Sequence, residues 1–479
     1  MNCTYAMRHA DDTANSSNQF WRRVRFVAAL AASLIFYGCA SMPDVEGLLD
    51  SRRGELTQFE TVGGPLSEER SARLIEAIKR KAGDTDILDK HMAVENALVD
   101  TPLVLGNRVV LLQDGKATYE AMLAAIAQAT DHINLETYIF DDDEIGYKFA
   151  DVLVEKQARG VQVNIIYDSF GGLKTPRTFF KRLTDAGINV LEFNPVNPLA
   201  ARRGWRINNR DHRKLLVVDG RVAFVGGINI SNVYSAGSVP KGDSTASRDP
   251  VAWRDTQMQI EGPVVADFQK MFMETWEKQK GKPLAAKNYM PTLKEAGKEI
   301  VRAIGSTPDD KYSQIYLTLI SAIRSAEKTV YLTNAYFVPD PNLLKALRES
   351  AARGVDVRLI LPSQSDSGTV FHAGRSHYSD LLASGVKIYE RKGALLHAKT
   401  AVIDGVWSTV GSTNLDWRSF LYNDEVDAIV LGAEFGKQME DVFSRDQAAS
   451  VAIDLETWER RPVGVRAREW AARLWERML

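Results

Sequence analysis

Apolar positions between residues 102 and 450 switch repeatedly between the spacing of strands and the spacing of helices. Short runs of apolar and β-branched residues, such as Val161 to Tyr167 (VQVNIIY), predict strands, and apolar residues three or four positions apart predict the helices between them. In the first half the predicted elements are strand 132–140, helix 145–159, strand 161–167, helix 176–186 and strand 188–193. This alternation favours a parallel or mixed sheet with helices on both faces.

The same order of elements occurs a second time. Its members are strand 329–338, helix 343–353, strand 355–361, helix 376–383 and strand 386–390. The junctions match in letters, because Arg159-Gly160-Val161 corresponds to Arg353-Gly354-Val355, and each glycine stands where a helix C′ residue is expected. We therefore predict a tandem α/β protein built from two similar halves.

Changes in composition divide the chain into six segments. The segment at 281–310 is polar and is the natural linker between the halves, and the one at 41–101 is a polar extension with a single helical pattern at 67–82. The expected segments are a signal peptide or membrane anchor (1–40), an N-terminal extension (41–101), a first α/β domain (102–280), a linker (281–310), a second α/β domain (311–450) and a C-terminal amphipathic tail (451–479).

The most apolar stretch, Phe26 to Gly38, follows a cluster of three arginines. As a helix it would cover about 20 Å, short of a bilayer core of about 30 Å, but its length suits the apolar region of an export signal. Gly38-Cys39-Ala40-Ser41 resembles a bacterial lipobox, so we expect lipidation at Cys39. An uncleaved signal anchor and an ordinary buried helix are the alternatives. Both the lipoprotein and the anchor place the body at the membrane, on the exported side of a bacterial envelope.

The C-terminal tail has apolar residues at helical spacing, namely Ala467, Trp470, Ala471, Leu474 and Met478. Four arginines occupy its other faces. This pattern predicts a basic amphipathic helix on a membrane surface. The alternative is a helix docked on its own domain with a solvated basic face.

Charge and composition exclude several classes of function. Sixty basic and sixty-two acidic residues give a net charge of −2, which disfavours a nucleic-acid binder. The only cysteines, Cys3 and Cys39, precede the folded body, which therefore has neither a disulfide framework nor a cysteine metal site. The seven histidines have no metal-ligand spacing, so we expect no metal and no other cofactor.

Each half ends in the same constellation, and the two copies lie 185 residues apart. Side chains two positions apart lie on the same face of a strand, so His and Lys share a face. Asp-Gly signals a hairpin turn after that strand. A glycine at the end of the returning strand allows close backbone approach to a ligand. The first copy comprises His212, Lys214, Asp219, Gly226, Gly227 and Asn229, and the second comprises His397, Lys399, Asp404, Gly411, Ser412 and Asn414.

Each residue type also has a structural interpretation. A lone histidine is often a structural hydrogen-bonding group, and a lone lysine often lies on the surface, but duplication at identical spacing argues against both. Asp219 and Asp404 are more ambiguous, because Asp-Gly is also what a type I′ turn requires.

Two histidines and two lysines that converge from two halves suit a phosphodiester substrate. The lysines and the asparagine amides would hold the non-bridging oxygens. One histidine would attack phosphorus while the other protonates the leaving alcohol, and a second alcohol or water would then resolve the phosphohistidine. Such a site needs one neutral and one protonated imidazole.

The paired His-x-Lys-x4-Asp motifs resemble those of the phospholipase D superfamily, and the letters around them are similar to bacterial cardiolipin synthases. The similar segments include Phe224-Val225-Gly226-Gly227-Ile228-Asn229, Trp253-Arg254-Asp255-Thr256, Tyr336-Phe337-Val338-Pro339-Asp340 and Gly411-Ser412-Thr413-Asn414-Leu415-Asp416-Trp417-Arg418. Gly227, Gln257 and Asn334-Ala335 depart from the usual letters. The resemblance implies two phospholipase D-like α/β/α domains that share one active site.

The resemblance also implies residue roles. It makes His212, Lys214, Asp219, His397, Lys399 and Asp404 catalytic, with His212 as the usual nucleophile. It adds Asp255 and Glu425 as acidic partners in the substrate-binding set, together with the Gly, Ser and Asn residues named above.

The implied reaction transfers a phosphatidyl group to phosphatidylglycerol and yields cardiolipin. The donor is phosphatidylglycerol or phosphatidylethanolamine, and the sequence leaves that choice and the oligomeric state open. The expected partners are these phospholipids and a membrane surface, with no nucleic acid. Phospholipid hydrolysis, a phospholipase D-like endonuclease and an inactive membrane scaffold are the alternatives.

Overall fold

The computed structural model describes residues 57–82, 85–197, 205–235 and 252–479, together with Leu199 and a few positions between 42 and 48. Residues 44–479 form one compact unit, separate from residues 1–43. Cys39 and the signal-like segment before it lie outside the described residues. Within the described ranges, no helix is both long and apolar enough to cross a membrane.

The first half consists of a mixed sheet and its helices. Its main elements are β3 (Leu103–Gln113), α5 (Asp114–Gln128), β4 (His132–Thr137), α6 (Glu144–Ala158), β5 (Gln162–Asp168), η2 (Gly171–Lys174), α7 (Arg177–Asp185), β6 (Asn189–Phe193), β7 (Arg210–Asp211), β8 (Leu215–Val218), β9 (Val222–Gly226), η4 (Asn232–Tyr234), β10 (Trp253–Arg254), β11 (Thr256–Glu261) and α8 (Val265–Lys278).

The second half repeats this architecture. Its elements are β12 (Glu299–Ser306), α9 (Gln314–Ser325), β13 (Thr329–Asn334), β14 (Phe337–Val338), α10 (Pro341–Ala352), β15 (Asp356–Pro362), α11 (Gly368–Arg375), α12 (Tyr378–Ala383), β16 (Lys387–Arg391), β17 (Leu395–Leu396), β18 (Lys399–Ile403), β19 (Trp407–Gly411), β20 (Leu415–Asp416), α13 (Trp417–Leu421), β21 (Asn423–Leu431) and α14 (Ala433–Ala448).

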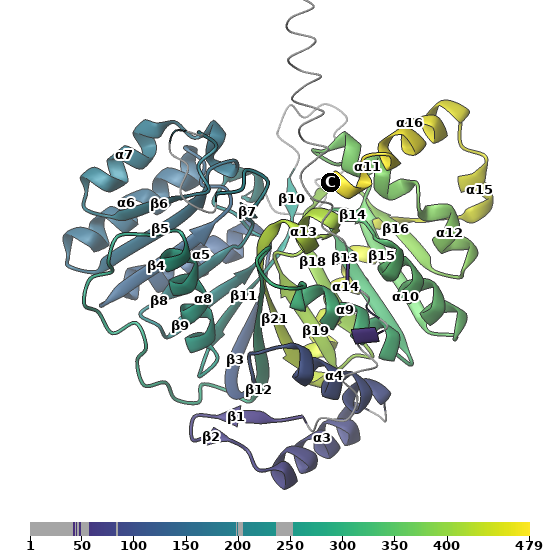
Figure 1. The fold of residues 1–479 in the computed structure, drawn as a ribbon, viewed down its shortest axis with the longest axis horizontal. Helices are drawn as coiled ribbons and strands as arrows, with labels where there is room; N and C mark the ends of the chain where they lie inside the picture. Colours follow the sequence, from purple (N-terminus) through teal and green to yellow (C-terminus); the bar gives the residue numbers. More distant parts are fainter. Residues whose placement is uncertain are drawn as a thin grey trace, which may run out of the picture. The chain divides into compact units, whose positions relative to one another are not determined.

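The pairing pattern joins the two halves into one sheet with internal symmetry (Figure 1). From its outer edge, the first half runs β6, β5, β4, β8, β9, β11 and β3, with parallel pairs only among β6, β5 and β4. The second half runs β16, β15, β13, β18, β19, β21 and β12, with parallel pairs only among β16, β15 and β13. β3 pairs with β12 at the centre. The predicted α/β class and its duplication are therefore confirmed.

Local sequence signals place the element ends. Gly160 and Gly354 have φ values of 87° and 93°, the left-handed conformation predicted for helix C′ residues. The Asp219-Gly220 and Asp404-Gly405 pairs also have positive φ, as their hairpins require. One difference concerns the expected linker at 281–310: from Glu299 it forms β12, whose buried Ile and Val residues place it in the sheet.

The N-terminal extension forms β1 (Phe59–Thr61), β2 (Gly64–Pro65), α3 (Glu68–Ala82), η1 (Asp86–Leu88) and α4 (Lys90–Leu98). It packs on the second half through a buried polar cluster around Glu95. The Glu95 carboxylate lies 2.9 Å from Arg302 Nη1 and 2.8 Å from His91 Nε2, and it accepts a hydrogen bond from Trp407 Nε1 at 3.1 Å. These charge-assisted contacts fasten the extension to the second half, while its strand β1 pairs with β3 of the first half.

The tail forms β22 (Ser450–Ile453), α15 (Leu455–Glu459), α16 (Val463–Arg473) and η5 (Glu476–Met478). β22 pairs with β16 at the outer edge of the second half. Figure 1 shows α16 beside α11, close to the C-terminal ends of β13 and β15.

Candidate active site

Strand pairing across the boundary between the halves positions His212. β7 pairs with the start of β21, and the His212 N–H donates to the Asp424 carbonyl at 2.9 Å. Glu425, the next residue of β21, has its two carboxylate oxygens 3.1 and 3.0 Å from His212 Nδ1. The first-half histidine is therefore paired with a second-half acid.

His397 is positioned in the same way with the halves exchanged. β10 pairs with β17, and the His397 N–H donates to the Arg254 carbonyl at 2.8 Å. The following residue is Asp255, whose Oδ2 lies 2.7 Å from His397 Nδ1. Both histidines thus depend on the other half for their acidic partner, and neither half alone holds a complete site.

This pairing fixes which ring nitrogen is available for chemistry. A carboxylate that accepts the Nδ1–H proton leaves the lone pair of a neutral imidazole on Nε2. Tyr138 packs edge-on against His212 with ring centroids 5.2 Å apart, and Tyr336 packs similarly against His397 at 6.3 Å. Both imidazoles are consequently buried and held in one orientation.

The two acids differ in what else they bind. Glu425 accepts hydrogen bonds from Ser412 Oγ at 2.5 Å and from Asn423 Nδ2 at 3.0 Å. At the position of Ser412 the first half has Gly227, so Asp255 has no matching hydroxyl donor and accepts the Thr256 N–H at 2.7 Å. Burial raises the pKa of Glu425, and the nearby Lys214 charge opposes that rise.

The lysines of the two motifs lie beside the histidines. Lys214 Nζ donates to the His212 carbonyl at 2.6 Å, and Lys399 Nζ donates to the His397 carbonyl. Burial lowers the pKa of Lys214 to about 7, although Glu425 acts to raise it, and burial lowers the pKa of Lys399 as well. These ammonium groups are therefore poorly solvated, which favours an anionic ligand between them.

The same environment keeps both histidines neutral near pH 7. Burial lowers the pKa of His212 well below its usual value, and the charges of Lys214 and Lys399 add to that effect. Burial and Lys399 lower the pKa of His397 to about 4, while Asp255 acts to raise it. An anionic phosphate would offset the lysine charges and favour an imidazolium.

Asp219 and Asp404 bind backbone groups rather than the histidines, and their catalytic role stays a prediction. Each follows the strand that leads away from its lysine. Asp219 accepts the backbone N–H groups of Thr130, Asp131 and His132 at 2.8 to 3.0 Å. Asp404 accepts the N–H groups of residues 327–329 at 2.8 to 3.0 Å. Both carboxylates therefore fasten a hairpin to the start of a neighbouring strand, as the turn interpretation allows.

The glycines make room for protein groups, and the predicted close approach of a ligand to them stays a prediction. A Cβ at Gly226 would meet the Gln257 side chain, and one at Gly411 would meet Asp427. A Cβ at Gly227 would collide with the Asp255 carboxylate. These close approaches require glycine, because the acids and their neighbours occupy the space that a side chain would need.

The two asparagines differ in their environments. Asn229 Oδ1 accepts the Ile139 N–H at 3.1 Å, and its Nδ2 donates to the Tyr234 hydroxyl at 3.0 Å. Its oxygen and one of its two N–H donors are therefore engaged within the protein, and its predicted role in holding phosphate oxygens stays a prediction. Asn414 Oδ1 has no hydrogen-bond partner among the described residues.

Several aromatic residues of the site were not predicted from the sequence. Tyr234 and Trp253 pack against His397 with ring centroids 5.7 and 5.0 Å away. Tyr138 and Tyr336 follow the matched strands β4 and β13, but they are one and two residues past the strand ends, so no duplicated position signalled them. Lys214 Nζ lies 5.2 Å from the centroid of the Tyr138 ring, a favourable cation–π contact.

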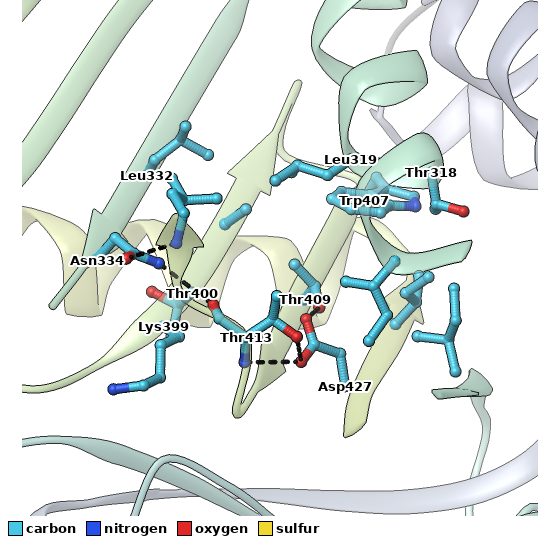
Figure 2. Close-up of a pocket in the computed structure, with 15 residues that line it drawn as sticks. Thr318, Leu319, Leu332, Asn334, Lys399, Thr400, Trp407, Thr409, Thr413 and Asp427 are labelled. Atoms are coloured by element: carbon cyan, nitrogen blue, oxygen red, sulfur yellow. Dashed lines mark hydrogen bonds between the residues drawn. The ribbon is translucent and has the colours of Figure 1, made fainter. Parts of the chain in front are cut away.

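Asp427 supports the loop that carries Ser412. It accepts the Ser412 N–H at 3.1 Å and the Thr413 hydroxyl at 2.8 Å. It lines a cavity between α9 and the sheet, and Figure 2 shows Lys399 at the edge of this cavity with its ammonium group pointing away from Trp407. The apolar part of the cavity, around Trp407, is therefore not where the Lys399 ammonium group points, and the cavity is separate from the space between the two histidines.

The described ranges contain no cluster of three or more His, Cys, Asp or Glu side chains arranged to hold a metal ion. Metal-independent chemistry stays a prediction.

Two duplicated His-x-Lys motifs that meet between two α/β halves define an enzyme of the phospholipase D type. A family described as "Cardiolipin synthase, PLD-like domain" matches residues 122–236 and 319–447. The chain belongs to this family, which confirms the resemblance seen in the motifs.

Curated relatives extend the match over most of the chain. A cardiolipin synthase of Geobacillus sp. (strain WCH70) is 36% identical over 379 residues, covering 78% of this chain and 73% of that protein. A cardiolipin synthase of Listeria monocytogenes serotype 4b (strain CLIP80459) is 34% identical over 415 residues, covering 85% and 84%. With the family match, these relatives identify the chain as a phosphatidyltransferase.

A solved structure shares the fold. Phosphatidylserine synthase of Haemophilus influenzae Rd KW20 superposes with a TM-score of 0.57 at 13% identity, covering 78% of this chain and 95% of that one.

Proposed function

We propose that this phosphatidyltransferase forms cardiolipin by transferring the phosphatidyl group of one phospholipid to phosphatidylglycerol. The observation that carries the proposal is the crossed pairing of His212 with Glu425 and of His397 with Asp255. It presents two imidazoles to one phosphodiester, each with Nδ1 bound and Nε2 available. The relatives named cardiolipin synthase support the choice of product.

In the first step, the Nε2 lone pair of neutral His212 attacks phosphorus of the donor. The bond from phosphorus to the headgroup oxygen breaks, and His397 gives its Nε2 proton to that oxygen. The products are a phosphatidyl-His212 adduct and a free alcohol, which is glycerol when phosphatidylglycerol is the donor. Lys214 and Lys399 neutralise the negative charge on the non-bridging oxygens.

In the second step, the bond to His212 breaks. His397, now neutral, takes the proton of the acceptor hydroxyl, and the acceptor oxygen attacks phosphorus. The electron pair of the phosphorus–nitrogen bond returns to His212, and cardiolipin leaves. Asp255 stabilises the His397 imidazolium that this step restores.

We also propose that the protein works at the exported face of a bacterial membrane, attached through its N-terminal segment. The support is the apolar run 26–38 and the lipobox-like Cys39. Mass spectrometry of the intact protein tests the attachment. Loss of residues 1–38 with a diacylated Cys39 is expected, and retention of residues 1–38 would reject the lipoprotein.

Product analysis with purified protein tests the reaction. Vesicles that contain phosphatidylglycerol with a labelled headgroup should yield cardiolipin and labelled glycerol in equal amounts, and EDTA should leave the rate unchanged. Phosphatidic acid as the main product would indicate hydrolysis, and cleavage of DNA in a parallel assay would indicate an endonuclease. A His212→Asn variant is the control for contaminating activity.

A further inference from the structure

The tail helix α16 exposes its large apolar residues together with its arginines, and it buries Glu469 and Ala472 against the protein. Glu469 is buried and accepts two hydrogen bonds from Arg461 at 2.9 and 2.7 Å, and Arg375 lies 3.7 Å from it. Trp470 and Leu474, by contrast, are 66% and 67% exposed. α16 therefore packs beside α11 with a solvated basic face, as the docked alternative expects, but it leaves Trp470 and Leu474 uncovered.

Apolar side chains of the first half are exposed near the same edge of the molecule. Phe170 and Leu173 follow the carboxyl end of β5 and are more than half exposed, and Ile207 is half exposed. We define the apolar rim as Phe170, Leu173, Ile207, Trp470, Leu474 and Trp475. It includes much of the large apolar surface that the described residues expose.

Hydrogen bonds tie one part of the apolar rim to the active site and join that side of the molecule to the chain end beside the other part. The Phe170 N–H donates to Asp168 at 2.7 Å, and Asp168 also accepts the N–H of Asp211, the residue before His212, at 2.9 Å. On the other side, Arg418 joins the two parts. Its N–H donates to the Leu479 carbonyl at 2.8 Å, and its Nη2 donates to Asn208 Oδ1 at 2.8 Å.

The charges around the apolar rim indicate what covers it. Arg466, Arg468, Arg473 and Arg477 are exposed beside Trp470 and Leu474, and Lys174 and Arg177 are exposed beside Leu173. Exposed tryptophan and leucine flanked by arginine is the composition of a helix that lies in a membrane interface. Arginines next to such a surface attract anionic lipid headgroups.

We propose that the apolar rim docks on an anionic phospholipid surface and holds the opening of the active site against it. The inference rests on the proposed function, because phosphatidylglycerol is itself an anionic lipid. It gives the substrate a short path, since one carboxylate, Asp168, binds both Phe170 of the rim and Asp211, the residue before His212. The occupant is the bilayer surface rather than a protein partner, because cationic and apolar groups alternate along the rim.

Hydrogen exchange on the full-length protein tests the docking peptide by peptide, so attachment through the N-terminal segment does not mask the result. Vesicles with equal parts of phosphatidylglycerol and phosphatidylcholine should slow exchange in peptides from 463–479 and 168–174 by about tenfold. High salt should weaken the protection, because it screens the arginine charges. Pure phosphatidylcholine should protect these peptides less.

The Trp470→Glu/Leu474→Glu double variant should lose most of the added protection. Its matched control is Val62→Glu/Val451→Glu, which places the same charges at exposed apolar positions, 48% and 52% exposed, on the β1–β2 turn and on β22. This control should keep the protection. Equal loss in both double variants would overturn the proposal.

Other outcomes also decide between occupants. Protection that appears without vesicles and grows with protein concentration would show that a second copy covers the rim. No protection, or equal protection by pure phosphatidylcholine, would overturn docking on an anionic surface. Protection without cardiolipin formation would contradict only the proposed function, whereas cardiolipin formation without protection would contradict only the docking.

Discussion

His397 Nδ1 lies 2.7 Å from Asp255 Oδ2 although the two residues belong to different halves of the sheet. The Tyr234 hydroxyl approaches the same nitrogen at 3.4 Å, so His397 has a partner that His212 lacks. In the corresponding pair, His212 and Glu425, the Ser412 hydroxyl donates a hydrogen bond to the Glu425 carboxylate. The two histidines are therefore related by symmetry but are not equivalent, as a nucleophile and a general acid require.

Asp255→Asn should lower kcat by about a thousandfold, because the amide keeps the shape of the carboxylate but cannot stabilise the His397 imidazolium. The loss should shrink for a donor whose leaving group needs no protonation, such as a nitrophenol ester. Glu425→Gln should show no such rescue, because it affects the orientation of His212. Steady-state rates on dispersed short-chain donors, with natural and with nitrophenol leaving groups, measure kcat for both variants. Glu274→Gln, on the surface of α8, is the control, and rescue of Glu425→Gln instead would exchange the two roles.

Asp219→Asn should lower stability and leave kcat nearly unchanged. Asn tolerates the φ of 51° at this position, but its NH2 group would face backbone N–H donors of Thr130 or Asp131. The loss of a charged acceptor should cost about 1–3 kcal/mol. Denaturant unfolding checks the cost and activity assays check kcat. A large drop in kcat with unchanged stability would place Asp219 in the catalytic set.

The fold was predictable because its signals are local. Apolar periodicity placed the repeated strands and helices, and Gly160 and Gly354 marked two helix ends. The start of β8 was not predictable in this way. The spacing of His212 and Lys214 placed both on one strand, but β8 begins only at Leu215, and the preceding β7 pairs with β21 instead.

The site was predictable in its residues but not in its pairing. His212, Lys214, His397 and Lys399 follow from duplicated spacing. The exchange of Asp255 and Glu425 between halves depends on how two similar domains pack, and no spacing within one motif contains that information. The groups that crowd Gly226 and Gly411 were not predictable for a related reason, since they lie opposite these glycines on the paired strands β11 and β21.

The affinity for phosphatidylglycerol should depend on pH through Lys214, whose pKa burial lowers to about 7. A lysine with a lowered pKa is cationic below that value and loses its charge as the pH rises through it. KM for a dispersed substrate should therefore rise above about pH 7 by up to tenfold per unit. In Lys214→Arg the charge persists to high pH. KM measured from pH 6 to pH 9 should stay flat in this variant, and the same rise in both proteins would exclude Lys214 as the cause.

The last prediction assigns the nucleophile. In His397→Ala, a donor with a good leaving group needs no general acid, so His212 should still be phosphatidylated. The variant lacks the base that activates the acceptor, and the adduct should accumulate. Acid-labile modification of a peptide containing His212, found by mass spectrometry, is the expected result.

His212→Ala is the reciprocal control and should trap nothing, although both variants should lose nearly all turnover because the two histidines act as a unit. Each substitution removes one imidazole from a buried, acid-paired position, so a thermal melt shows whether the variant is folded before its adduct is sought. An adduct on His397 would reverse the two roles. Absence of any adduct in two folded variants would favour direct in-line transfer between lipids, in which Glu425 and Asp255 orient two general acid–base groups rather than a nucleophile and its partner.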